Sequence, residues 1–227
     1  MGLATWTLLS VLSEPDRCAR FRTEASKCLL SSSDAKGSIQ FDTTALQKNS
    51  YIHGVWCESI RLGGQMALAR VVASDTELEG YLLRKGSVVL LPARMLHYNE
   101  AVFPNAKDFK PERWMVPGDD GNDETDISQE EKAAIKERVR KQRASLRAFG
   151  GGASMCAGRF AAEKEILSTV AAMLLLLDIE VETGGAIRRD DESQKGFKIS
   201  LNPRSLGIMD PAGETKVRLR RREIPSQ

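Results

Sequence analysis

Apolar residues recur every three or four positions in four stretches of the chain, residues 3–12, 17–30, 51–62 and 160–177. This spacing gathers them on one face of an α-helix, so each stretch predicts a helix with a buried side. The last stretch is the most apolar, and it has no interior glycine or proline to interrupt it. A shorter helix, capped by its first aspartate, is expected at residues 42–46.

Residues 128–143 follow a different helical pattern, because most of their positions are charged and few are apolar. Ser128 and Glu131 have the spacing of a capping box, in which each side chain satisfies the other residue's backbone N–H. Residues 117–126 ahead of them are acidic and rich in turn-forming residues, which indicates a loop.

Short runs rich in β-branched and other apolar residues predict strands in two groups. In the first group, residues 67–73 and 87–91 flank a hairpin at residues 79–86 whose turn contains glycine. The second group lies near the end of the chain, at residues 179–182, 197–201 and 215–219. Small sheets among longer helices predict a mainly α protein of the α+β class.

The amino-acid composition excludes only a few classes of function. The 227 residues are 41% hydrophobic and 28% charged, with a net charge of +2, so no global field favours nucleic acid as a partner. The four cysteines contain no Cys-x-x-Cys pair, which is typical of a reducing compartment. No apolar run reaches the roughly 18 residues that a membrane helix needs, and no signal peptide is expected at the start.

The stretch at residues 149–162 carries the strongest candidate chemistry. Cys156 follows a run of three glycines and precedes the most apolar helix. A thiolate near a helix N-terminus is stabilised by the helix dipole and by free N–H groups, as a soft metal ligand requires. The alternative is a glycine-rich turn with a buried structural cysteine, since free cysteine is a common core residue.

Two further segments carry charged residues in a suggestive order. Glu58 and Arg61 lie three apart on the helix predicted at residues 51–62, a spacing that on its own is typical of a weak surface ion pair. Downstream, residues 109–114 read Phe-Lys-Pro-Glu-Arg-Trp and place Arg113 before a tryptophan.

Together these motifs resemble the cytochrome P450 superfamily. Its haem-binding signature is similar to the spacing of Phe149, Gly152, Cys156, Gly158 and Ala162. The segment from Glu58 to Arg61 resembles its Glu-x-x-Arg motif, and residues 109–114 resemble the motif that supplies a second arginine.

The resemblance implies a fold and its extent. Residues 1–227 would be a partial domain, the C-terminal half of the P450 fold on the proximal side of the haem. It would run from the end of the central long helix to the C-terminal strands, with residues 117–147 as a variable charged insertion. The acid–alcohol pair that relays protons in the family would fall before Met1, so no catalytic residue is expected in this chain.

The resemblance also implies a role for each site residue. Cys156 would be the axial ligand of haem b, and Phe149 would shield its sulfur. Gly150 and Gly152 would let the backbone pass under the porphyrin, while Gly158 and Ala162 would keep the following helix close to it. A separate, structural network would consist of Glu58, Arg61 and Arg113. Arg70 would reach a haem propionate, although a solvated strand arginine is an equal alternative.

The implied activity is that of a haem-thiolate monooxygenase. It would insert an oxygen atom from O2 into a lipophilic substrate, with electrons from an NADPH-dependent reductase. Substrate contacts are expected at residues 62–67 and near Leu206 and Gly207. Full-length members typically lie at the ER membrane, facing the cytosol. The basic cluster at residues 136–147 is interpreted as a solvated helix in preference to a reductase contact.

Two alternatives remain open from the sequence. The chain would be a truncated, catalytically incompetent fragment, or a haem-binding module without oxygenase activity. Either would expose the apolar face of Trp6, Leu8 and Leu9, and large uncovered apolar patches favour association. Low solubility is therefore expected.

Overall fold

The computed structural model describes residues 2–30, 39–64, 66–118, 127–182, 187–188, 198–199 and 214–222. The helices in these ranges are α1 (Gly2–Leu12), α2 (Pro15–Ser26), α3 (Thr43–Lys48), α4 (Ser50–Gly63), α5 (Ala93–His97), α6 (Gln129–Ser145) and α7 (Arg159–Leu176). Two short 3-10 helices, η1 (Pro111–Trp114) and η2 (Gly152–Ser154), precede α6 and α7 respectively. None of these helices combines the length and the apolar composition needed to cross a bilayer.

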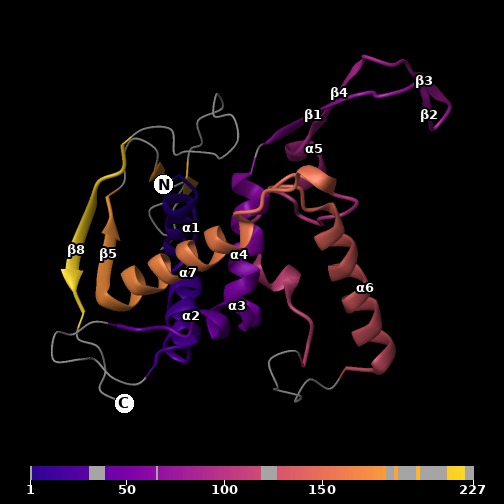
Figure 1. Cartoon of the computed structure of the whole chain (residues 1–227). Coiled ribbons are helices and arrows are strands. Elements are labelled where there is room, and N and C mark those ends of the chain that lie inside the picture. Colours follow the sequence, from indigo (N-terminus) through magenta and orange to yellow (C-terminus); the bar gives the residue numbers. More distant parts are fainter. Residues whose placement is uncertain are drawn as a thin grey trace.

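Helix α4 is the centre of the packing. It contacts α1, α2, α3, α7 and η1, and nearly all of its residues are buried (Figure 1). Close approach to η1 is possible because Gly54 has no side chain: a Cβ there would lie 2.5 Å from the carbonyl oxygen of Pro111. Helix α7 crosses the same core and also contacts α1, α2 and α3 (Figure 1).

The observed helices begin and end close to the predicted positions, with local differences. Asp42 caps α3 by accepting hydrogen bonds from the backbone N–H groups of Thr44 and Ala45. The capping box of Ser128 and Glu131 is present at the start of α6. The helix expected at residues 17–30 is shorter than predicted, because α2 ends at Ser26.

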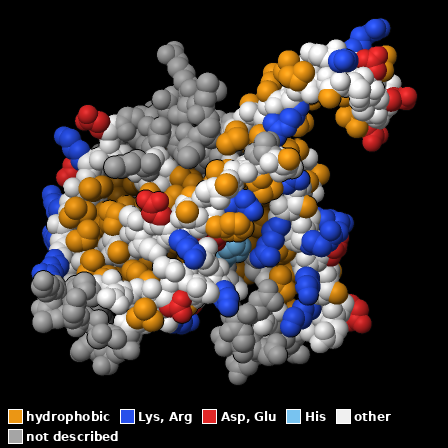
Figure 2. All heavy atoms as spheres, in the orientation of Figure 1, with side chains coloured by type: hydrophobic (Ala, Val, Ile, Leu, Met, Phe, Trp, Pro, Cys, Tyr) orange, Lys and Arg blue, Asp and Glu red, His pale blue; other side chains and the backbone are white. Residues whose placement is uncertain are grey.

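The first group of strands forms a long projecting hairpin. Strand β1 (Ala67–Val71) pairs antiparallel with β4 (Val88–Pro92), and β2 (Thr76–Leu78) pairs with β3 (Tyr81–Leu83) at the tip. Glu79 and Gly80 make the turn, both at positive φ, where glycine is the favoured residue. The hairpin extends away from the helices and carries exposed apolar side chains (Figures 1 and 2).

The second group follows α7 in the chain, and its first strand packs against that helix. Strand β5 (Leu177–Val181) pairs antiparallel with β8 (Val217–Arg221), and β6 (Ile187–Arg188) pairs with β7 (Lys198–Ile199). Long helices with small antiparallel sheets make the mainly α, α+β fold that the sequence predicts.

The expected exposure of the first helix is wrong. Trp6 is only 6% exposed and Leu9 only 3% exposed, and Leu8 packs against the core. Trp6 is covered because Gly63 on α4 leaves room for its ring, which a Cβ at that glycine would approach to 2.8 Å. Exposed apolar side chains lie instead on the projecting hairpin, including Tyr81 and Val88.

Candidate functional site

The loop at residues 149–158, here called the cysteine loop, holds Cys156 at the start of α7. The backbone N–H of Cys156 donates to the carbonyl of Phe149 across 3.0 Å, which closes the loop. Gly150 and Gly152 take positive φ angles of 84° and 65°, a conformation that a residue with a Cβ adopts only with strain. The thiol side chain of Cys156 is exposed.

Helix α7 begins directly after the cysteine. Gly158 is its N-cap residue, and the carbonyl of Gly158 accepts the N–H of Ala162 at 2.9 Å. Cys156 therefore lies near the positive end of a helix of 18 residues. Arg159 Nη1 donates to the carbonyl of Cys156 at 2.9 Å and fixes the loop against the first turn.

Two side chains attach the cysteine loop to the rest of the fold. The ring of Phe149 stacks on Trp56 of α4 with a centroid distance of 6.0 Å and an interplanar angle of 28°. Arg70 of β1 is exposed, and its Nη2 donates to the carbonyl of Gly151 at 3.3 Å. The structure thus brings Arg70 to the cysteine loop, together with the helix that holds Glu58.

Glu58 is the centre of a buried hydrogen-bond network. Its carboxylate accepts two bonds from Arg61, at 2.7 and 2.8 Å, and one from Arg113 Nε at 2.8 Å. Trp114 Nε1 donates to the same carboxylate at 2.8 Å, and the backbone N–H of Lys110 at 3.0 Å. A fully buried carboxylate is tolerated only when it is paired and hydrogen-bonded in this way.

Arg61 uses the full donor capacity of its guanidinium. Besides the two bonds to Glu58, it donates to the backbone carbonyls of His97, Ala106 and Asp108. Arginine has five N–H donors, and the geometry of these bonds engages each nitrogen. The network therefore joins α4 to α5 and to the segment ahead of η1.

His97 connects this network to the cysteine loop. Its ring lies between the carbonyl of Gly64, 3.2 Å from Nδ1, and the backbone N–H of Arg147, 2.9 Å from Nε2. Nε2 must accept from Arg147, so Nδ1 carries the proton and donates to Gly64. Burial lowers the pKa of His97 to about 4, and the ring is therefore neutral at pH 7.

Sequence reasoning missed the roles of Trp114 and His97. The tryptophan was visible as the last residue of the motif at residues 109–114, but nothing in its type indicates that its indole faces a carboxylate. His97 gives no local signal either, because its partner Arg147 is fifty residues away in the chain. Leu206 and Gly207, expected near substrate, lie outside the described residues.

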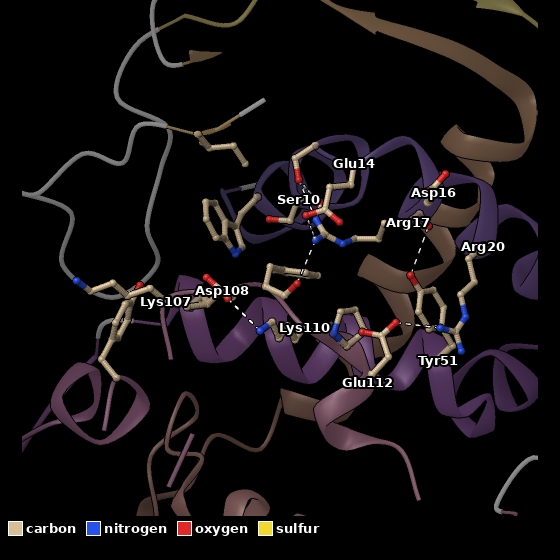
Figure 3. Close-up of a pocket in the computed structure, with 17 residues that line it drawn as sticks. Ser10, Glu14, Asp16, Arg17, Arg20, Tyr51, Lys107, Asp108, Lys110 and Glu112 are labelled. Atoms are coloured by element: carbon tan, nitrogen blue, oxygen red, sulfur yellow. Dashed lines mark hydrogen bonds and ion pairs between the residues drawn. The ribbon is translucent and has the colours of Figure 1, made fainter. Parts of the chain in front are cut away.

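A hollow of about 640 Å³ lies elsewhere, between the turn that joins α1 to α2 and the segment before η1 (Figure 3). Arg17 faces it and donates to Ser13 Oγ at 2.8 Å. Across the hollow, Arg20 pairs with Glu112 at 2.9 Å. As far as the structure describes its walls, none of them belongs to the cysteine loop.

The cysteine loop fits a flat, metal-bearing ligand such as haem. The exposed sulfur of Cys156 is accessible to a metal ion. A Cβ added at Gly152 would meet no described heavy atom within 4 Å, so there is open space beside the loop. Glycine there also permits a ring to approach the backbone closely.

Comparisons with known sequences and structures agree on one protein family. The sequence model of cytochrome P450 matches residues 4–208. A cytochrome P450 monooxygenase of Gibberella zeae is 27% identical over 218 residues, which cover 93% of this chain and 38% of that protein. The 5-beta-cholestane-3-alpha,7-alpha-diol 12-alpha-hydroxylase of Sus scrofa is 28% identical over 225 residues, covering 96% of this chain and 41% of the hydroxylase.

A solved structure shares the fold. The crystal structure of the cytochrome P450DA heme domain aligns with a TM-score of 0.66 at 20% identity, over 98% of this chain and 41% of that one. The chain thus spans about two fifths of the length of these relatives.

Proposed function

The chain belongs to the cytochrome P450 family, and we propose that it is the haem-holding part of a haem-thiolate monooxygenase. Residues 1–227 would form the C-terminal half of the P450 fold on the proximal side of the haem, with residues 117–147 as a charged insertion. Cys156 would be the axial ligand of haem b.

The observation that carries this proposal is the placement of Cys156. Its thiol is exposed on a glycine loop whose ends are closed by a hydrogen bond to Phe149. It also lies two residues before the N-cap of α7, at the positive end of the helix dipole. A buried structural cysteine, the alternative for this position, would not present its sulfur at the surface.

The surrounding residues have distinct tasks in this proposal. Phe149, held by Trp56, would limit the access of water to the sulfur. Gly158 and Ala162 begin α7 without bulky side chains and would let this helix lie close to the ring. Arg70, already at the cysteine loop, would place a guanidinium where a propionate can accept its hydrogen bonds.

The buried network would hold the ligand loop in position. Arg61 bonds the carbonyl of His97, and the His97 ring accepts the N–H of Arg147, two residues before the cysteine loop. Glu58, Arg61 and Arg113 would therefore act on the geometry of the site and not on the chemistry.

Haem bound through a thiolate supplies the activation of O2 for insertion of one oxygen atom into a substrate. Electrons would come from an NADPH-dependent reductase. A lipophilic substrate is proposed because relatives with similar sequences include a sterol 12-alpha-hydroxylase by name.

The test is a spectrum followed by turnover. The chain is loaded with haem, reduced and exposed to carbon monoxide, and the Soret band is recorded for the native chain and for Cys156→Ala. Cys28→Ala is the matched control, because it removes a buried thiol that lies outside the loop. The proposal expects the red-shifted band of a thiolate-ligated haem in the native chain and the control, and its loss in Cys156→Ala.

Two outcomes would contradict the proposal in different ways. The same spectrum with and without Cys156 would reject the ligand assignment. The expected band without any oxygenated product, in the presence of reductase and NADPH, would favour a haem-binding module that lacks oxygenase activity.

A further inference from the structure

A second cysteine lies in a cluster that the proposed haem site does not use. Cys57 Sγ is 3.4 Å from Nε2 of His53, and Nδ1 of the same imidazole is 3.0 Å from Oε1 of Glu163. The three side chains form a chain in which the imidazole ring lies between the thiol and the carboxylate. It joins α4, which carries Cys57 and His53, to α7, which carries Glu163.

The sequence explains why these groups meet. His53 and Cys57 are four residues apart on α4, so they lie one above the other on the same face of the helix. Glu163 lies on the buried side of α7, which packs against α4. Cys57 is 4% exposed, whereas the side chain of His53 is 30% exposed and connects the cluster to solvent.

The geometry sets the direction of proton transfer. The carboxylate of Glu163 accepts a hydrogen bond from Nδ1–H of His53, which leaves Nε2 to exchange a proton with the thiol of Cys57. Burial is the largest single influence on His53 and lowers its pKa, but the hydrogen bonds and charges of Cys57 and Glu163 outweigh it and raise the pKa to about 10. A protonated imidazole 3.4 Å from the sulfur can supply a proton to a group that the sulfur attacks.

The other two buried cysteines provide the contrast. Burial raises the pKa of Cys18 and also that of Cys28, and in the described part of the chain neither has a histidine within hydrogen-bond distance. These two thiols are therefore expected to be inert.

Metal binding is the other common use of cysteine, histidine and glutamate, and the geometry does not support it. Cys57 and Glu163 contact opposite nitrogens of one ring, so a single ion cannot contact all three side chains. No group of three such residues with ligand geometry occurs within the described ranges.

We propose that Cys57 is a reactive thiol, activated by His53 and Glu163, which hydrogen peroxide oxidises to a sulfenic acid. The thiolate sulfur attacks one peroxide oxygen, the O–O bond breaks, and the departing oxygen takes a proton from His53 Nε2 to leave as water. Sulfur is oxidised and the peroxide is reduced. The burial of Cys57 restricts the reaction to small neutral oxidants that enter beside the His53 ring.

The test measures the oxidation of each cysteine separately in the purified chain. Hydrogen peroxide is added at neutral pH, sulfenic acid is trapped with dimedone, and the labelled peptides are quantified by mass spectrometry. Cys57 is expected to be labelled at least about tenfold faster than Cys18 and Cys28. His53→Gln should slow the labelling of Cys57 by about tenfold or more, and Glu163→Gln by several-fold.

The matched control is Glu165→Gln, an exposed glutamate two residues along the same helix, which should leave the rate unchanged. Continued protection of Cys18 and Cys28 shows that each variant is folded. A second reagent, methyl methanethiosulfonate, reports thiol reactivity without an oxidant, so haem iron cannot affect the result. The proposal is overturned if Cys57 reacts as slowly as Cys18, or if its rate is the same in the Glu163→Gln and Glu165→Gln variants.

Discussion

Arg61 binds the carboxylate of Glu58 through two parallel hydrogen bonds, from Nε to Oε2 at 2.8 Å and from Nη2 to Oε1 at 2.7 Å, and both side chains are fully buried. Such a pair gains from two charge-assisted bonds but loses the hydration of both groups. The remaining bonds from Arg113 and Trp114 offset that loss. The pair therefore depends on its whole network.

Removal of the negative charge of Glu58 should destabilise the fold strongly. Glu58→Gln leaves two buried guanidinium groups without a counter-charge, and we expect it to lower the free energy of unfolding by about 3–5 kcal/mol. Chemical denaturation, followed by circular dichroism, measures this change. Glu137→Gln is the control, because Glu137 also pairs with an arginine three residues on but is exposed to solvent. Equal shifts in the two denaturation midpoints would show that the buried network contributes no more to stability than the exposed ion pair.

The shape of the guanidinium should matter as well as its charge. Arg61→Lys keeps the positive charge but replaces five N–H donors by three, so at least two buried acceptors among Glu58 and the carbonyls lose a partner. A loss of about 2–4 kcal/mol is expected from two unsatisfied buried groups. Arg140→Lys on the exposed pair is the control in the same denaturation assay. Stability equal to that of the native chain would contradict the donor assignment.

The close contact between α4 and η1 makes a packing prediction. Gly54→Ala would place a Cβ 2.5 Å from the carbonyl oxygen of Pro111, and the backbone must shift to accept it. A loss of about 1–3 kcal/mol in the free energy of unfolding is expected. Gly151→Ala is the control, because its Cβ would only contact Arg147 at 3.6 Å, and it should change stability by no more than about 1 kcal/mol. Comparable losses would mean that the contact with η1 is not tight.

The pKa values of the two histidines are shifted in opposite directions from the ordinary value near 6.5. Burial lowers the pKa of His97 to about 4, so its contribution to stability is complete above pH 6.5 and is lost as the pH falls towards 4. Burial also lowers the pKa of His53, but the hydrogen bonds and charges of Cys57 and Glu163 raise it more strongly, to about 10. Its contribution is present below pH 6.5 and is lost as the pH rises towards 10.

Nitrogen-15 NMR of the imidazole rings measures both values directly. At neutral pH we expect one neutral ring protonated at Nδ1, assigned to His97, and one charged ring, assigned to His53. His53→Gln should remove only the second set of signals. Two rings that titrate together near the ordinary value would contradict both placements.

Much of the fold could be predicted from the sequence because its signals are local. The apolar period of residues 51–62 and 160–177 defines helices that the structure places close to those positions, as α4 and α7. The capping residues Asp42 and Ser128 act within three residues of themselves. The burial of Trp6 was not predictable in this way, since it depends on the absence of a side chain at Gly63, on another helix.

In the candidate site, too, the features local in the sequence could be predicted, and those that join distant segments could not. The cysteine loop and the pair of Glu58 and Arg61 are visible because their residues lie close together in the chain. The link from Arg61 through His97 to Arg147 joins three segments, and only the folded chain brings them together. The cluster of His53, Cys57 and Glu163 was not predicted, because its carboxylate comes from a helix more than a hundred residues later.

The proposed bond between the sulfur of Cys156 and haem iron can be measured by iron K-edge X-ray absorption of the haem-loaded chain. We expect a sulfur atom in the first coordination shell of the iron in the native chain and in Cys18→Ala, and its disappearance in Cys156→Ala. A shell made only of nitrogen and oxygen in the native chain, or a sulfur that persists in Cys156→Ala, would show that Cys156 is not the ligand.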